Sequence, residues 1–107
     1  MILHSAIARV ALAAEPGGRH SRATLAGQRA LRRALVMLAG QLRPGLQLAE
    51  EGFGLDHGPR GEPTVVEVPP GFPGARESLR VSVSHTRAQA WALAAIEADA
   101  GPEPADG

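Results

Sequence analysis

The chain has 107 residues, of which 44% are hydrophobic, and this allows one domain with a modest core but not two. It contains no cysteine, which excludes disulfides, thiolate metal sites and a cysteine nucleophile. The net charge is zero, and because only 3% of the residues are aromatic, the core has few large side chains and self-association would help to stabilise it.

Charge is unevenly distributed along the chain. Residues 1–45 hold seven arginines and a single acid, Glu15, whereas residues 46–107 hold four arginines and ten acids. The basic half could bind phosphates or an acidic protein; alternatively, the two halves neutralise each other. Nucleic acid is not an expected partner, because aromatic residues are not interleaved with the arginines and no helix-turn-helix pattern is present.

The opening stretch, MILHSAIARVALAA, is apolar, but His4 and Arg9 interrupt it and it lacks the basic start of a secretory segment. No apolar run approaches the length of a membrane span. We therefore expect a soluble cytoplasmic protein with no membrane partner.

The first half of the chain is predicted to contain one long helix. Residues 2–14 could form a short strand that runs into a helix, although their alanines leave the type of element open, and residues 15–21 are expected to form a loop. Leucines recur at helical spacing between residues 22 and 42, and Pro44–Gly45 ends the pattern, so an amphipathic helix is predicted there. These leucines are Leu31, Leu35, Leu38 and Leu42.

Strands are predicted in the second half. Residues 46–63 are expected to be irregular, the β-branched segment 64–68 to be a strand, and residues 69–78 to be a loop. The segment 79–84 alternates strictly between apolar and polar residues, which predicts a half-buried strand. Residues 88–97 are ambiguous, because their alanines favour a helix although they follow a strand and a tight turn.

The order of these elements indicates the class of fold. A helix followed by strands is typical of an α+β domain, which we expect to span residues 1–97. Residues 98–107 are polar and rich in proline and glycine, so a disordered C-terminal tail is predicted.

His85 is the first candidate functional residue. It ends the alternating strand, with Ser84 and Thr86 on either side and Arg87 next. A histidine in such surroundings can bind an anion or act as a general acid or base. Alternatively, it is an ordinary polar residue of a surface turn.

Arg29, Arg32 and Arg33 are the second candidate group. They lie three and four residues apart and so share one face of the predicted helix. Such a face could hold a phosphate or an acidic partner helix, or it is simply a solvated helix surface. The four histidines have no metal-ligand spacing, and no metal site is expected.

Three segments in order resemble the 4'-phosphopantetheinyl transferase superfamily, specifically its holo-acyl-carrier-protein synthase branch. LAGQRALRRAL at 25–35 is similar to the family helix F-x-x-K-E-x-x-x-K-A-L. GEPTV at 61–65 is similar to G-K-P-x-V, and SVSHTRAQAWALAAIE at 82–97 to S-[IVL]-S-H-[TS] followed by a small-residue strand that ends in Glu. The resemblance covers about residues 2–97.

The resemblance implies a small antiparallel sheet packed on helices, with 88–97 as a strand paired with 79–84. It also implies a homotrimer that binds coenzyme A between subunits. Ser84, His85, Arg87 and Arg33 would then contact coenzyme A, and the basic helix face would meet an acyl or peptidyl carrier protein.

The departures from the family pattern fall on its metal ligands. Family members hold Mg²⁺ with an aspartate in the opening strand and the glutamate of the K-E pair. IARV at 7–10 also resembles the family's opening segment, and its alignment places Leu3 at the aspartate, while the alignment of 25–35 places Arg29 at the glutamate. Gln28 and Glu62 replace two family lysines. An arginine would repel Mg²⁺, so Mg²⁺ is not expected as a cofactor, and coenzyme A is the one cofactor that the resemblance leaves open.

Three functions follow from this comparison. The sequence favours a repurposed protein that catalyses a metal-independent reaction on a carrier-bound or free intermediate, as in polyketide or other natural-product biosynthesis. His85 would be the acid or base, and Arg29 would clamp an oxyanion or carboxylate. The alternatives are a non-catalytic protein that binds carrier protein, coenzyme A or a partner subunit, and a true transferase in which Arg29 replaces the metal. Whether the chain is an enzyme stays open.

Overall fold

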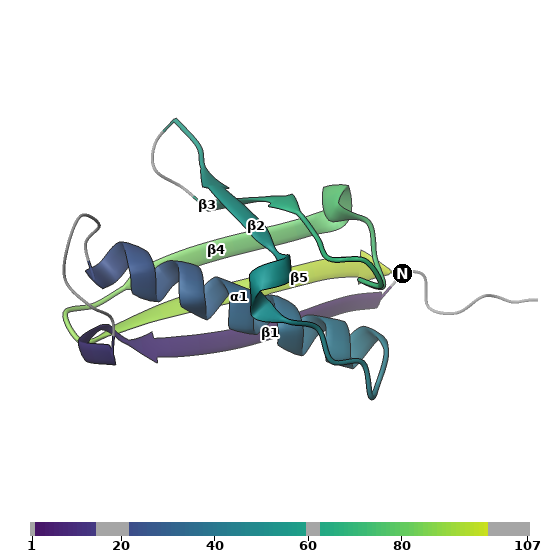
Figure 1. The fold of residues 1–107 in the computed structure, drawn as a ribbon, viewed down its shortest axis with the longest axis horizontal. Helices are drawn as coiled ribbons and strands as arrows, with labels where there is room; N and C mark the ends of the chain where they lie inside the picture. Colours follow the sequence, from purple (N-terminus) through teal and green to yellow (C-terminus); the bar gives the residue numbers. More distant parts are fainter. Residues whose placement is uncertain (1, 15–21, 60–62, 99–107) are drawn as a thin grey trace, which may run out of the picture.

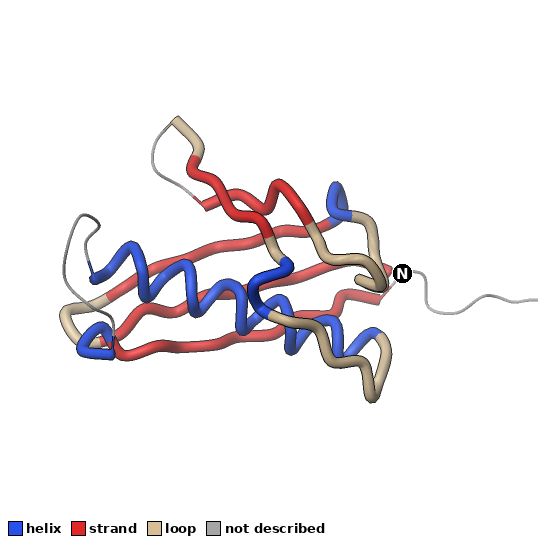
Figure 2. The backbone as a smooth tube through the Cα atoms, viewed as in Figure 1, coloured by secondary structure: helices blue, strands red, loops and turns tan. Residues whose placement is uncertain are grey.

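The structure is a computed structural model that describes residues 2–14, 22–59 and 63–98. Its elements are β1 (Ile2–Ala11), η1 (Leu12–Ala14), α1 (Arg22–Leu42), η2 (Glu50–Gly52), β2 (Gly54–His57), β3 (Pro63–Glu67), η3 (Arg76–Ser78), β4 (Leu79–His85) and β5 (Gln89–Ala98). The helix α1 lies across one face of the three-stranded antiparallel sheet β1–β5–β4 (Figures 1 and 2). The α+β class and the small antiparallel sheet are as predicted, although one α-helix of the described residues covers the sheet rather than several.

The central strand β5 fixes the register of the sheet. It pairs with β1 from Ile2↔Ala98 to Ala11↔Gln89 and with β4 from Leu79↔Ile96 to His85↔Ala90. The hairpin between β4 and β5 confirms the strand at 79–84 and resolves the ambiguous segment as a strand. Since β5 continues to Ala98, the strand enters the segment predicted to be the tail, and residues 99–107 lie outside the described part of the chain.

The core lies between α1 and the sheet. The leucines Leu31, Leu35 and Leu38 of α1 are fully buried, and each stabilises the fold by about 1.5–3 kcal/mol through burial. Opposite them, β1 and β5 present mostly alanines, which let the helix approach closely. Gly27 marks the closest approach, because a Cβ atom at this position would lie 2.9 Å from Cγ1 of Val83. The sheet residues buried in this layer are Ala6, Ala8, Val10, Ala90, Ala92, Ala94 and Ile96.

In the first half of the chain, one expected element differs from the structure. The segment 2–14 is almost entirely strand, and its expected helix is only the short 3-10 turn η1. The amide of Leu12 in η1 donates a hydrogen bond to the carbonyl oxygen of Ala88 at 2.9 Å, which ties this turn to the β4–β5 hairpin. The helix α1 ends as predicted, and Gly45 supplies the positive φ of 90° after it. The loop expected at 15–21 lies outside the described residues.

The segment expected to be irregular contains η2 and β2, so that expectation was wrong. β2 pairs with β3 in an antiparallel ribbon beside the main sheet, with Leu55 opposite Val65 (Figure 1). Phe53, which precedes β2, is buried and packs edge-on against Phe72, with ring centroids 5.7 Å apart. This aromatic pair holds the start of the ribbon against the core.

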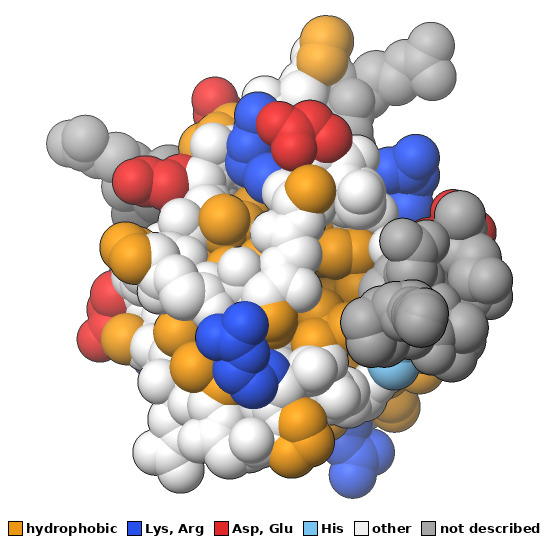
Figure 3. All heavy atoms as spheres, turned by 90° about the vertical axis from the view of Figure 1, so that its right-hand side faces the viewer, with side chains coloured by type: hydrophobic (Ala, Val, Ile, Leu, Met, Phe, Trp, Pro, Cys, Tyr) orange, Lys and Arg blue, Asp and Glu red, His pale blue; other side chains and the backbone are white. Residues whose placement is uncertain are grey.

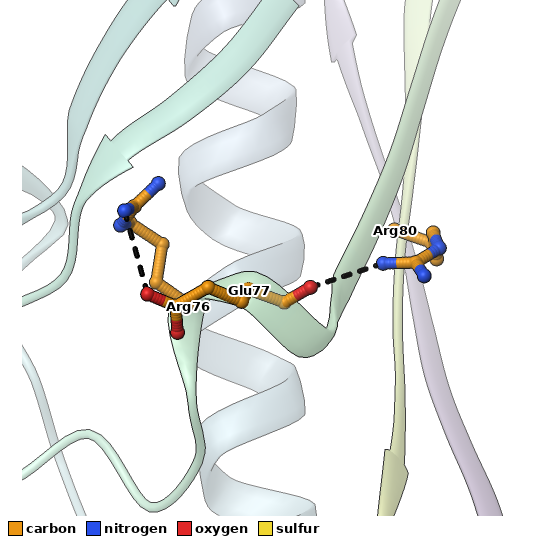
Figure 4. A network of polar contacts seen from close by, with 3 residues as sticks. All are labelled: Arg76, Glu77 and Arg80. Carbon is orange, nitrogen blue, oxygen red and sulfur yellow. Dashed lines mark hydrogen bonds and ion pairs between the residues drawn. The ribbon is translucent and has the colours of Figure 1, made fainter.

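The corner before β4 contains a short helical turn where the sequence predicts a loop. The loop expected at 69–78 ends in η3, where Arg76 pairs with the carboxylate of Glu77 at 3.5 Å. Arg80 donates a hydrogen bond to the carbonyl oxygen of Glu77 at 3.2 Å (Figure 4). It donates a second one to the carbonyl oxygen of Leu79 at 3.1 Å. These contacts close the turn into β4.

Two features of the described residues concern possible partners: the distribution of surface charge and the hydropathy of the helices. On the end of the molecule seen in Figure 3, basic and acidic side chains are dispersed among neutral ones rather than gathered by sign. In the part of the chain that the structure describes, no helix has the length and hydropathy needed to cross a membrane.

Candidate functional site

The structure contains an open hollow beside α1. Its volume is about 800 Å³, and it lies between the helix and the segment that leads into η2. Its lining among the described residues consists of Arg29, Arg32, Leu48, Glu50 and Glu51. Two of the three arginines predicted as a functional helix face therefore line one concave surface.

Two contacts hold the far wall of this hollow against α1. Nε of Arg32 donates a hydrogen bond to the carbonyl oxygen of Phe53 at 3.3 Å. Nε of Arg33 lies 3.6 Å from Oε2 of Glu50, with both side chains nearly half exposed. An exposed ion pair of this kind contributes less than about 1 kcal/mol, so the bond from Arg32 and the burial of Phe53 position the wall.

The charges of the hollow are mixed. The guanidinium groups of Arg29 and Arg32 can each present two parallel N–H donors to a carboxylate or a phosphate. The carboxylates of Glu50 and Glu51 are acceptors for ammonium, hydroxyl or amide donors. The lining therefore suits a ligand that carries an anionic group and hydrogen-bond donors, with Leu48 as an apolar contact.

The β4–β5 turn holds the other candidate, His85. The hydroxyl of Thr86 accepts hydrogen bonds from the amides of Ala88 and Gln89, both at 3.2 Å, and the amide of Thr86 donates to the carbonyl oxygen of Gln89 at 2.8 Å. The turn is thus closed by its own residues. His85 is exposed, and its Nδ1 lies 3.3 Å from the carbonyl oxygen of Thr86.

The structure separates Ser84 from His85. Successive side chains of a strand point to opposite faces, and Ser84 pairs with the exposed Trp91 whereas His85 pairs with the buried Ala90. Ser84 therefore lies on the sheet face away from α1, and His85 on the face toward it. Arg87 is exposed in the turn.

The candidate residues do not all meet in one site of the single chain. Arg29 lines the hollow, and Arg33 lies beside it in the ion pair with Glu50. His85 is not among the described residues of the lining. Leu3, which stands where the resemblance expects a metal-binding aspartate, is exposed on the sheet face opposite α1. A carboxylate at position 3 would therefore point away from the helix that carries Arg29.

The wall opposite the helix was not anticipated from the sequence. Leu48, Glu50 and Glu51 fall in the segment expected to be irregular, and no periodicity places them against α1. The one available signal was Phe53, a large apolar residue among polar neighbours, which had to be buried somewhere.

Among the described residues, no three histidine, aspartate or glutamate side chains come together in a way that could hold a metal ion. No protein-family model matches the chain, and no curated protein is significantly similar to it. Function is therefore inferred from the site and from the motifs in the sequence.

Proposed function

We propose that the chain is a diverged phosphopantetheinyl-transferase-like protein that binds an anionic biosynthetic intermediate, free or carrier-bound, in the hollow beside α1. The observation that supports this most is that Arg29 and Arg32 line one open concavity of about 800 Å³. The motif order from residue 25 to residue 97 supplies the class of intermediate, which is a compound of natural-product biosynthesis such as a polyketide precursor.

In this proposal three of the lining residues have roles that follow from their chemistry. Arg29, which is exposed, clamps the carboxylate or phosphate of the ligand. Arg32 adds a second guanidinium whose orientation is set by its bond to Phe53. Glu51 accepts a hydrogen bond from an ammonium, hydroxyl or amide of the ligand. The ligand class is thus a small acid that also carries donors, and coenzyme A and carrier-bound pantetheine belong to it.

Binding is favoured over catalysis by the position of His85. A general acid or base must come within hydrogen-bonding reach of the group that it protonates. His85 is exposed at the β4–β5 turn and is absent from the described lining of the hollow. The proposed site thus has anion-binding groups and no histidine among its described residues.

The second candidate is the metal-independent reaction in which His85 is the acid or base. It is supported by the closed turn, since the bonds to Thr86 hold the backbone of His85 in place without a ligand. For this function, assembly would have to bring His85 of one copy to the hollow of another. The homotrimer implied by the resemblance would be one such assembly, and a transferase in which Arg29 replaces the metal would need it too.

The test is titration calorimetry of the full chain with coenzyme A and with apo and holo carrier proteins, without Mg²⁺. The proposal predicts saturable binding that falls at least about tenfold in Arg29→Gln, which is a loss of about 1.4 kcal/mol. Arg43→Gln is the matched control, because Arg43 is also exposed and lies outside the described lining. Equal loss in Arg43→Gln would contradict the proposal, since it would mean that overall charge decides binding.

Intact-mass spectrometry of the carrier protein separates binding from transfer. The apo carrier is incubated with coenzyme A and the chain, with and without Mg²⁺, beside a working transferase. The proposal predicts an unchanged carrier mass in all samples that contain only this chain. A gain of one phosphopantetheine that is lost in His85→Ala would favour the transferase function instead.

A further inference from the structure

The sheet has one face that nothing in the described structure covers. α1 packs on the even-numbered residues of β1 and β5, which leaves the odd-numbered residues of these strands and the even-numbered residues of β4 on the opposite side. We call this the bare sheet face. It carries four large exposed apolar side chains: Leu3 (65% exposed), Ile7 (58%), Trp91 (38%) and Leu93 (38%).

The register brings these apolar side chains together. Ile7 lies directly opposite Leu93, and the next row along the sheet pairs Arg9 with Trp91. Residues opposite each other in antiparallel strands have Cβ atoms about 4.5–5.5 Å apart, so Ile7, Leu93 and Trp91 form one continuous patch. Leu3 lies beyond the next row, which holds Ser5 and Ala95. Large contiguous apolar patches on an otherwise polar surface mark interaction sites.

Charged side chains lie at the two ends of the bare sheet face and at its β4 edge. Arg9 stacks on Trp91, with its Cζ atom 5.5 Å from the ring centroid. Glu97 lies at the other end, where it pairs with Leu3. The rows between them hold uncharged residues on β1 and β5, namely Ser5, Ala95, Ile7 and Leu93. On the edge strand β4 these rows end in Arg80, which is exposed and lies beside Ala95, and in Ser82.

We propose that the bare sheet face binds the same face of a second copy of this chain, with the strands of the two copies running in opposite directions. A two-fold axis in the plane between the sheets, perpendicular to the strands, places the Arg9 row of each copy on the Glu97 row of the other. In the middle, the row of Ile7 and Leu93 of each copy meets the row of Ser5 and Ala95 of the other, with Arg80 at the β4 edge opposite Ser82. Two opposite-charge pairs form at the ends. The result is a sandwich of two sheets with a helix on each outer side.

The charge pattern is the reason to choose a second copy as the occupant. An isologous interface requires a self-complementary surface, and this face is self-complementary only when it is reversed end for end. With parallel strands, Arg9 would share a row with Arg9 of the other copy, and Glu97 with Glu97. Like charges brought together in that way disfavour association.

The size of the face fits a weak dimer. Strands of up to ten residues at about 3.3 Å per residue, spaced about 4.8 Å apart, give a projected area on the order of 450 Å² for each copy. Side chains that stand up from the sheet increase this area, so the two copies together approach the lower end of specific interfaces, about 1,200 Å². The dimer is therefore expected to dissociate on dilution.

The experiment is sedimentation equilibrium of the full chain over a wide concentration range. The proposal predicts a mass that rises from 11.1 kDa toward twice that value. Trp91 is the only tryptophan and the chain has no tyrosine, so its fluorescence reports on the same face. Its emission should shift to shorter wavelength with the same concentration midpoint. A mass that stays at 11.1 kDa, or one that approaches three copies, would overturn the proposal.

Variants locate the interface. Ile7→Glu should weaken association at least about tenfold, because it places a charge in the apolar centre. Met37→Glu is the matched control, since Met37 is 48% exposed on α1, away from the face, and this variant should dimerise as the native chain does. Equal association by Ile7→Glu and the native chain would show that another surface is used.

A charge exchange tests the direction of the strands. Arg9→Glu alone should weaken the dimer, and Arg9→Glu combined with Glu97→Arg should restore it to within about threefold. Within one chain the two residues lie at opposite ends of the face, so restoration must come from contacts between copies. Failure of the double variant to recover, with each variant folded by circular dichroism, would reject the reversed arrangement even if Ile7→Glu does not fold.

Discussion

Nε of Arg32 donates a hydrogen bond to the carbonyl oxygen of Phe53, 21 residues further along the chain, at 3.3 Å. This bond joins the middle of α1 to the residue that precedes β2. Arg32 therefore lines the hollow and also holds the opposite wall in place. The proposed site and the docking of the β2–β3 ribbon therefore depend on the same side chain.

The first prediction concerns this bond. Arg32→Ala leaves the carbonyl group of Phe53 without its side-chain donor, so the free energy of unfolding should fall by about 1 kcal/mol. Chemical denaturation measures the change, and Arg43→Ala, at an exposed position after α1, should alter stability by less than about 0.5 kcal/mol. Equal stabilities of the two variants would mean that the bond does not hold the wall.

The second prediction concerns the core. Leu35 is fully buried under the sheet, and Leu35→Ala should lower the free energy of unfolding by about 2–5 kcal/mol through lost burial and a residual cavity. Met37 lies two residues away on the exposed side of the same helix, and Met37→Ala should cost less than about 0.5 kcal/mol. Thermal and urea unfolding measure both variants. A larger loss of stability in Met37→Ala than in Leu35→Ala would mean that the buried and exposed faces of the helix are assigned wrongly.

The third prediction compares one substitution at two glycines of α1. Gly40→Ala should stabilise the helix by about 0.5–1 kcal/mol, because a Cβ atom there meets nothing within 4 Å. Gly27→Ala meets Cγ1 of Val83 at 2.9 Å, and the stiff β-branched side chain cannot easily move aside. Overpacking costs about 1–3 kcal/mol, so the Gly27 variant should be the less stable of the two. A Gly27 variant as stable as the Gly40 variant would show that the helix lies further from β4.

The fourth prediction concerns the β4–β5 turn. Thr86→Val removes the hydroxyl that accepts bonds from the amides of Ala88 and Gln89, and stability should fall by about 1 kcal/mol. Thr86→Ser keeps the hydroxyl and is expected to lose less than half as much. Hydrogen exchange at the two amides checks the cause, since it should accelerate in the valine variant alone. Unchanged exchange there would mean that the backbone, and not the hydroxyl, closes the turn.

The elements with a strong pattern were predictable from the sequence, and those that depend on distant contacts were not. The leucines of α1 recur at helical spacing and the residues of β4 alternate between apolar and polar, and the structure contains both of these elements. β5 was ambiguous because alanine favours a helix in isolation, whereas the burial of Ala90, Ala92 and Ala94 beneath α1 requires a strand in this context. β2, with the sequence GLDH, has no β-branched residue, and its strand exists through its pairing with β3.

The same division holds for the candidate site. Arg29 and Arg32 could be predicted as one helix face, since residues three apart on a helix are neighbours. Glu50 and Glu51 could not, because their place opposite the arginines results from the burial of Phe53 and from the bond that Arg32 makes across 21 residues. Ser84 and His85 were expected to act together, and the alternation of the strand separates them to opposite faces of the sheet.

The most direct test of the proposed function is nuclear magnetic resonance of the ¹⁵N-labelled chain, in which the Nε–H signals of individual arginines are followed during titration with coenzyme A. We expect saturable shifts at Arg29 and Arg32 and at the amides of Glu50 and Glu51, with Arg43 unchanged. Shifts confined to His85 and Arg87 in the β4–β5 turn, or the absence of any saturable shift with coenzyme A and with holo carrier protein, would contradict it.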